Sequence, residues 1–186
     1  LDNLPLEDLR AQPLPKELIS LDNKLFRALK KSVKGKELLE HSNALRAEVP
    51  AGTYHNTLRI DGYEAEIELC ARLTVAADGV HLDFTGTSDC SKKGINVPLN
   101  YATAYSVFAL RCIIGPDIPN NAGSLAPFKV SGPPGCILNA QPPAPVAMRH
   151  TLGQMTPDLV YGCLHQAIPE RIPAEGASSM YDLPMR

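Results

Sequence analysis

The sequence lacks the features that mark several common classes of protein. Its longest apolar run is only a few residues, well below the roughly 20 that a membrane-spanning helix needs. It also has no excess of positive charge, because 18 Lys and Arg residues stand against 20 Asp and Glu residues. Nucleic-acid-binding domains are usually strongly basic. We therefore expect a protein that binds neither membranes nor nucleic acid.

Motifs for phosphates and metal ions are missing as well. There is no P-loop or GxGxxG motif, and the two prolines within residues 132–135 remove the amide donors that a phosphate cradle needs. The five histidines show no HxxxH or HxxH spacing, and the five cysteines show no CxxC. A zinc site and a disulfide framework are therefore not expected. We interpret the cysteines as small apolar residues of a cytoplasmic protein.

Two sections that differ in amino-acid composition follow each other along the chain. Residues 1–48 are rich in charge, and the helical spacing of their leucines predicts helices near 15–33 and 36–47. Residues 49–186 are expected to form an α+β body. The chain begins without Met and without a signal-peptide pattern, so we expect it to be a piece of a longer protein.

Alternating apolar residues between about 53 and 85 predict an antiparallel β-meander of three strands. Every second residue from Tyr63 to Val75 is apolar, and Asp-Gly dipeptides at 61–62 and 78–79 are typical of two-residue hairpin turns. Such a sheet has one buried face, which helices must cover. The register that two-residue turns impose pairs Arg59 with Glu64, His55 with Glu68, Val75 with Leu82, and Leu73 with Phe84.

Residues 118–157 contain eight prolines and four glycines but only two charged residues, Lys129 and Arg149. Disordered proline-rich segments are usually more polar. We therefore predict an ordered, irregular segment that is buried against the protein or a partner. The flanking sequence predicts helices at 100–114 and 157–167 and extra strands at 127–131 and 136–139.

Two places in the chain could carry chemistry. His81 and Asp83 lie two residues apart on one face of a predicted strand, where they could ligate a metal or transfer protons. A polar pair on the solvent face is the more common situation. Arg149 lies in nearly uncharged surroundings, where a charge is costly without an anionic partner. That partner could be a substrate oxygen, a phosphate or a structural carboxylate.

Several short motifs also occur in a fixed order. They are Gly52–Tyr54 (GTY), Asp61-Gly62, Leu82–Ser88 (LDFTGTS), Gly94–Pro98 (GINVP), Ile118–Gly123 (IPNNAG), Pro133–Asn139 (PPGCILN), Pro142–Val146 (PPAPV) and Arg149. This series resembles the hydantoinase B / oxoprolinase family over about residues 36–175.

The resemblance implies a role in an ATP-dependent hydrolase of cyclic amides such as hydantoin and 5-oxoproline. In that family an A-type ATPase partner uses ATP and Mg²⁺ to phosphorylate the substrate, and the B-type subunit completes ring opening. We expect this chain to be part of a B-type subunit within an oligomer. The alternatives are a B-type subunit of an ATP-dependent ketone carboxylase and a non-catalytic assembly module of either complex.

The polar residues of the matching motifs are the candidate site residues. Asp83, Asn96 and Arg149 are predicted to be catalytic, with Asp83 orienting a water or an amide and Arg149 holding phosphate. The predicted substrate-binding residues are Asn120, Asn121 and Gly123. The family's metal-binding motif belongs to a region that precedes this segment, so we expect no cofactor to bind here. We also expect the isolated chain to be inactive.

Overall fold

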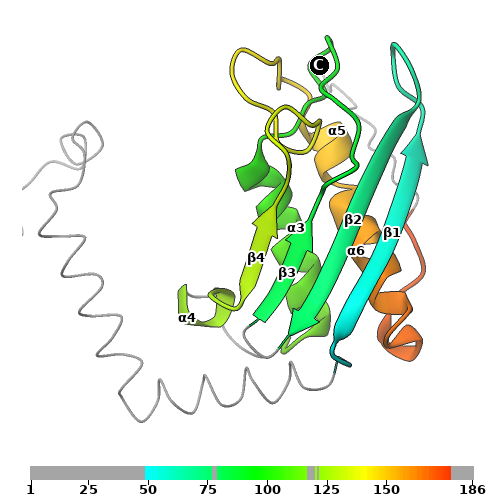
Figure 1. The fold of residues 1–186 in the computed structure, drawn as a ribbon, viewed down its shortest axis with the longest axis vertical. Coiled ribbons are helices and arrows are strands. Elements are labelled where there is room, and N and C mark those ends of the chain that lie inside the picture. The colour runs from blue at the N-terminus through cyan, green and yellow to red at the C-terminus, as the bar shows by residue number, and fades with distance from the viewer. Residues whose placement is uncertain (1–48, 77–78, 117–119, 121, 177–186) are drawn as a thin grey trace, which may run out of the picture.

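The computed structural model describes residues 49–76, 79–116, 120 and 122–176 (Figure 1). The predicted helical section 1–48, with its helices near 15–33 and 36–47, lies outside the described residues. The elements in chain order are β1 (Gly52–Ile60), β2 (Ile67–Ala76), β3 (Gly79–Asp83), α3 (Leu99–Ile113), α4 (Ala122–Leu125), β4 (Phe128–Ser131), α5 (His150–Gly153), α6 (Thr156–His165) and the 3-10 helix η1 (Pro169–Arg171).

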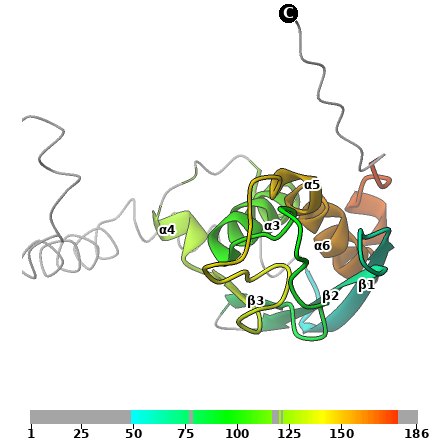
Figure 2. The same ribbon diagram turned by 90° about the horizontal axis from the view of Figure 1, so that it is seen from above.

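The four strands form one sheet in the order β1-β2-β3-β4. The first three are antiparallel neighbours, and β4 joins β3 in parallel after the chain has passed through α3. Helices α3 and α6 lie on one face of the sheet, and the opposite face is open in the described part of the chain (Figures 1 and 2). The predicted α+β class and meander are confirmed, and β4 confirms the strand predicted at 127–131.

The predicted two-residue connection is wrong in the first hairpin, whereas in the second hairpin two residues separate the strands but lie one position earlier than predicted. Arg59 lies opposite Glu68 instead of Glu64, and Val75 lies opposite Val80 instead of Leu82. The alternation of apolar residues continues through residues 61–66, which is why a strand was predicted there. In the structure these residues connect β1 to β2 and belong to neither strand. The register differs by four residues in the first hairpin and by two in the second. Both differences are even, so the predicted set of inward-facing residues in β2 is retained from residue 67 onward.

Gly79 explains the error in the second hairpin. It pairs with Ala76 inside the ladder and therefore belongs to β3, not to the turn. A Cβ at Gly79 would overlap the carbonyl oxygen of Pro127, which accepts a hydrogen bond from the Val80 amide at 2.9 Å. Because Gly79 has no side chain, the segment that leads into β4 can lie directly against it. The local sequence does not reveal this contact.

The core lies between the sheet and the two long helices. Burial alternates along β2, where Leu69 and Leu73 are fully buried while Arg72 is exposed. The α6 helix contributes Leu159 and Cys163, which are also fully buried. Each leucine side chain removed from water in this way stabilises the fold by about 1.5–3 kcal/mol.

The helix predicted at 100–114 is confirmed as α3, although its cap differs. The helix begins after Pro98, and Asn100 makes no side-chain capping bond. Gly115 follows the last turn with φ +66°, a left-handed conformation that glycine adopts easily. The helix predicted at 157–167 is confirmed as α6. The strand predicted at 136–139 is wrong, because those residues form turns with only an isolated bridge to residue 89.

The Pro- and Gly-rich segment is ordered, as predicted, where the structure describes it. Residues 132–149 pack against residues 85–98 at the end of the sheet to which β3 and β4 run (Figure 1). The Ile137 amide donates to Ser88 O at 2.8 Å, and the Val97 amide donates to Ile137 O at 2.8 Å. Because Ile137 is also fully buried, this segment is part of the folded body.

Two hydroxyl groups continue the ladder of β2 beyond the end of β3. Thr87 Oγ1 accepts a hydrogen bond from the Cys70 amide at 2.9 Å and donates to Cys70 O at 3.1 Å. Ser88 Oγ accepts from the Glu68 amide at 2.9 Å. The LDFTGTS motif therefore satisfies backbone groups of β2 that would otherwise lack a neighbouring strand. None of the helices in the described ranges is long and apolar enough to cross a membrane.

Candidate functional site

Asp83 lies at the end of β3 on the open face of the sheet. Its Oδ2 is 3.2 Å from Arg72 Nη2, and its Oδ1 accepts hydrogen bonds from Thr85 Oγ1 at 3.0 Å and Ser131 Oγ at 3.3 Å. The Asp83 side chain keeps 30% of its exposure, so solvent or a ligand can still reach it. The carboxylate is held in one orientation, as a group that orients a water must be.

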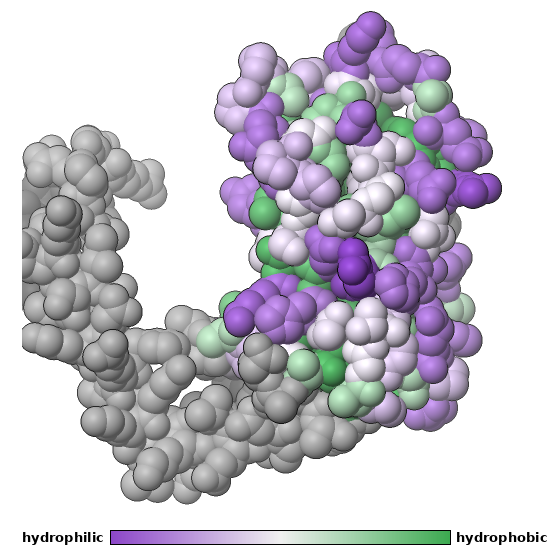
Figure 3. Space-filling model, viewed as in Figure 1, coloured by the Kyte–Doolittle hydropathy of each residue, from purple (hydrophilic) through white to green (hydrophobic). Residues whose placement is uncertain are grey.

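Figure 3, in the same view as Figure 1, shows mostly purple and pale residues on the open side of the sheet, with green ones between them. His81 lies on this face too, opposite Thr74 on β2 and Lys129 on β4. No group of three His, Cys, Asp or Glu side chains that could hold a metal ion occurs among the described residues. The possible role of His81 and Asp83 as metal ligands therefore stays a prediction.

Asn96 is fully buried, and its amide joins two loops. Its Oδ1 accepts from the Ser91 amide at 2.7 Å, and its Nδ2 donates to Ser91 O at 2.9 Å, Lys93 O at 3.0 Å and Pro145 O at 2.9 Å. An amide nitrogen has two protons, so these acceptors use its whole donor capacity. The geometry supports a structural role for Asn96, and its predicted catalytic role stays a prediction.

Two of the three predicted substrate-binding residues lie at the other end of the sheet. Asn120 and Gly123 are near α4, which precedes the start of β4, whereas Asp83 is at the end of the parallel strand β3 (Figure 1). Asn121 lies outside the described residues. The structure therefore does not bring Asn120 and Gly123 together with Asp83 or Arg149.

Arg111 is a residue that sequence reasoning missed. Although it is an arginine, only 6% of it is exposed. Its Nε donates to Asn120 Oδ1 at 3.2 Å, and its Nη1 donates to Ile114 O at 2.9 Å. Burial lowers the pKa of Arg111 from its ordinary value. The sequence signal for Arg111 was a charged residue within the apolar pattern of α3. Its side chain binds Ile114 and Asn120, which follow the helix.

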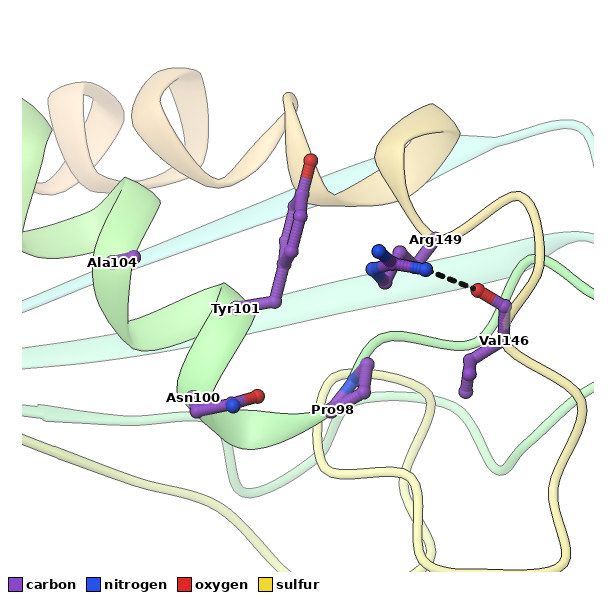
Figure 4. Close-up of a pocket in the computed structure, with 6 residues that line it drawn as sticks. All are labelled: Pro98, Asn100, Tyr101, Ala104, Val146 and Arg149. Atoms are coloured by element: carbon purple, nitrogen blue, oxygen red, sulfur yellow. Dashed lines mark hydrogen bonds between the residues drawn. The ribbon is translucent and has the colours of Figure 1, made fainter. Parts of the chain in front are cut away.

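Arg149 lies beside a pocket of about 470 Å³ at the start of α3 (Figure 4). The pocket is lined by Pro98, Asn100, Tyr101, Ala104, Val146 and Arg149. Asp83 does not line it, because Asp83 faces the open side of the sheet. Arg149 supplies the only charge among these lining residues, so the pocket suits an anionic group.

Aromatic contacts fix the geometry of this pocket. The Arg149 Cζ atom lies 5.6 Å from the centroid of the Tyr101 ring, within the range of a cation–π contact. Tyr101 in turn stacks on Tyr105, with centroids 4.9 Å apart and hydroxyl oxygens 3.4 Å apart. The hydrogen bond to Tyr105 and partial burial raise the pKa of Tyr101. The ring therefore stays neutral beside the guanidinium at neutral pH.

Comparison with known proteins adds an independent line of evidence. The sequence profile of the hydantoinase B/oxoprolinase family matches residues 28–186. The putative B-type subunit of a D-/L-hydantoinase from Pseudomonas sp. (strain NS671) is 31% identical over 157 residues, covering 74% of this chain and 26% of its own. The 5-oxoprolinase 1 of Arabidopsis thaliana is 30% identical over 125 residues, covering 64% of this chain and 10% of its own.

Two solved structures share the fold. The ATP-dependent caprolactamase of Pseudomonas jessenii matches with a TM-score of 0.65 and 23% identity, over 89% of this chain and 28% of its own. Nucleotide-free acetone carboxylase matches with a TM-score of 0.60 and 14% identity, over 75% of this chain and 22% of its own. The chain thus spans less than a third of the length of each of these relatives.

Proposed function

The chain belongs to the hydantoinase B/oxoprolinase family, and we propose that it forms part of the B-type subunit of an ATP-dependent hydrolase of cyclic amides. In this proposal an A-type partner phosphorylates the substrate, and the B-type subunit completes ring opening. The observation that carries the proposal is the 31% identity to a relative named as the B-type component of a hydantoinase. A relative named 5-oxoprolinase supports the same class of reaction.

The chemistry explains why such a reaction needs ATP. The carbonyl carbon of an unstrained lactam is a weak electrophile, and transfer of the γ-phosphoryl group to its oxygen makes that carbon open to attack. One water adds to the carbon, a proton passes to the ring nitrogen, and the C–N bond breaks to leave an amine and an acyl phosphate. A second water then converts the acyl phosphate to a carboxylate and inorganic phosphate.

Asp83 is the residue of this chain that we propose to orient the attacking water. Arg72, Thr85 and Ser131 hold its carboxylate at the end of β3, and its partial exposure leaves room for a further hydrogen bond. The steps assigned to this chain are the orientation of water and substrate by hydrogen bonding and charge. ATP and Mg²⁺ are proposed to bind to the A-type partner.

The reaction class can be tested with the full-length B-type subunit and its A-type partner. We expect ADP release to be stimulated by 5-oxoproline, hydantoin or caprolactam and to be accompanied by the ring-opened product. Stimulation by acetone plus bicarbonate alone would overturn the proposal in favour of the carboxylase alternative. Absence of stimulation by either kind of substrate would favour the assembly module.

The role of Asp83 is tested in the same assay with Asp83→Asn. We expect ring opening to slow by about 10²-fold, the loss that a misplaced reacting group can cause. The free energy of unfolding should fall by no more than about 1 kcal/mol, because the pair with Arg72 is partly exposed. Lys92→Ala, at an exposed loop position, is the control. Unchanged turnover in Asp83→Asn would remove the residue from the mechanism.

A further inference from the structure

We propose that the outer face of α3 is an internal contact surface of a longer subunit, and that a further part of the same polypeptide covers it. This face is formed by Ala104, Tyr105, Phe108 and Cys112 of α3 and by the adjoining Tyr161 of α6. The contact concerns how the subunit is assembled, and it does not depend on which reaction the subunit catalyses.

The α3 helix carries almost no charge, although one side of it lies at the surface of the described part of the chain. Its only charged residue is Arg111, which is buried and donates hydrogen bonds to Ile114 O and Asn120 Oδ1. A surface helix normally has charged residues on the side away from the core, whereas a helix that lacks such a side is normally buried all round. The composition of α3 is therefore that of an interior helix.

Burial along α3 follows the helical period and leaves one stripe exposed. Ala104, Phe108 and Cys112 lie one turn apart on this stripe, and 59% of Phe108 is accessible. Tyr105 lies beside them and is half-buried. The main contacts of α3 with other described elements are with α6, β4 and α5, and Figure 2 shows α3 and α6 together on one side of the sheet. These neighbours leave the stripe uncovered.

Tyr161 extends the face from α3 onto α6. It is half-buried, and its side chain is hydrogen-bonded to Cys112. The face thus consists of aromatic rings, a methyl group and a thiol, with no charged group among them. Aromatic residues are enriched and charged residues are depleted at the buried centre of protein contacts. An exposed apolar patch of this kind marks an interaction surface.

The size of the relatives indicates which chain covers the face. The matching region is 26% of the hydantoinase relative, 28% of the caprolactamase chain and 22% of the acetone carboxylase chain, so more than two-thirds of each polypeptide lies outside it. Contacts between separate subunits that form and dissociate have a polar rim, whereas permanent contacts resemble a core cut in half. An uncharged helix face is therefore best explained by permanent cover from the same polypeptide.

The open face of the sheet provides the contrast. Arg59 Nε lies 3.6 Å from Glu68 Oε2, and Arg72 Nη2 lies 3.2 Å from Asp83 Oδ2, so this face carries charges of both signs. Charged side chains suit a surface that meets water or a polar ligand. In the longer subunit we therefore expect the α3 side to face inward, while Asp83 on the opposite side stays accessible.

Cys112 provides a natural probe of the contact. The 186-residue chain and the full-length subunit are each treated with N-ethylmaleimide, and the labelling of each cysteine is followed by peptide mass spectrometry. We expect Cys112 to react readily in the 186-residue chain and at least about tenfold more slowly in the full-length subunit, where labelling requires local opening. Cys163, which is fully buried, is the protected control in both proteins.

The other occupants of the face give different results. Equal labelling of Cys112 in both proteins would overturn the proposal. Protection that appears only when the A-type partner is added would also overturn it, because the partner would then cover the face. Slow labelling in the 186-residue chain itself would mean that the chain covers its own face or, if the rate depended on concentration, that a second copy does. Either result would contradict cover by a further part of the polypeptide.

Phe108→Gln tests the same contact through stability. Gln is a good helix former, so the melting temperature of the 186-residue chain should change by no more than about 2 °C. In the full-length subunit we expect a loss of about 5 °C or more, because the side chain is buried there. Tyr63→Gln, at an exposed aromatic residue outside the face, is the matched control in the 186-residue chain and should have an equally small effect. Equal shifts for Phe108→Gln in both proteins would contradict the proposal.

The labelling experiment and the ADP assay fail independently. Protection of Cys112 in a full-length subunit without lactam-stimulated ADP release would support the contact surface and overturn the reaction class. Lactam-stimulated ADP release with equal labelling of Cys112 in both proteins would leave the proposed function standing and overturn the contact surface. The two proposals can therefore be judged separately.

Discussion

Gly153 lies directly against the ring of Tyr101, which lines the pocket beside Arg149. A Cβ at Gly153 would overlap Cε1 of Tyr101. We expect Gly153→Ala to push the ring away from Gly153 and to lower the free energy of unfolding by about 1–3 kcal/mol. Urea unfolding measures the loss.

Gly94→Ala is the matched control for this substitution. The nearest heavy atoms to a Cβ at Gly94 lie 3.5 Å away, which is an ordinary contact distance. We expect its free energy of unfolding to change by no more than about 0.5 kcal/mol. Equal losses in both variants would show that the Tyr101 contact is not the cause.

At the level of residues, sequence reasoning identified polar positions but not what each one contacts. Arg149 was singled out because its surroundings carry little charge, and the structure places it beside a pocket. Asn96 was singled out as a polar member of a motif, yet its amide is used up in holding two loops together. Arg111 was missed, because the apolar pattern of α3 gives no sign of the backbone carbonyl that its guanidinium meets. Those partners depend on tertiary contacts.

At the scale of elements, helix α6 packs closely on strand β1, because Gly162 of the helix lies directly against the Asn56 side chain of the strand. Asn56 Nδ2 donates to Leu159 O at 3.1 Å, and a Cβ at Gly162 would overlap the Asn56 side chain. We expect Gly162→Ala to lower the free energy of unfolding by about 1–3 kcal/mol because the helix must move away from the strand. Urea unfolding of this 186-residue chain measures the loss.

A double-mutant cycle with Asn56→Ala tests the cause. Asn56→Ala alone should cost about 1 kcal/mol for the lost hydrogen bond. In the double variant the added methyl group has space, so the total loss should be smaller than the sum of the single losses by about 0.5–3 kcal/mol. Additive losses would mean that the two residues do not compete for the same space.

The elements themselves were the most predictable part of the fold. The meander, α3, α6 and β4 follow from periodicity and from Pro and Gly signals that act locally. The turns were not predictable, because Asp61-Gly62 opens a longer loop and Gly79 serves a contact with the distant Pro127. A dipeptide signal cannot reveal that a backbone from elsewhere in the chain lies against it.

For the molecule as a whole, buried acids that keep their protons make stability depend on pH. Burial raises the pKa of the Cys163 thiol to about 12 and that of the Tyr161 hydroxyl to about 12. The unfolded chain releases these protons near their ordinary values of 9.0 and 10.0, while the native state retains them. The free energy of unfolding should therefore be constant with respect to these groups below about pH 9 and should fall above it.

This prediction can be checked by urea unfolding between pH 8 and about 11. Cys163 alone should contribute a slope of about 1.4 kcal/mol per pH unit above pH 9. Cys163→Ala should lower stability at every pH because it leaves a cavity, and it should flatten the slope. Cys70→Ala, on the open face of the sheet, should keep the wild-type slope. A wild-type slope in Cys163→Ala would contradict the assignment.

The side-chain hydroxyls that extend β2 have a consequence for the behaviour of the molecule in crowded solution. A strand whose amides and carbonyls are unpaired is a template for a strand from another chain, and such pairing starts aggregation. Thr87 and Ser88 occupy the amides of Cys70 and Glu68 where β3 has already ended. The chain thereby blocks this pairing site with two hydroxyl groups.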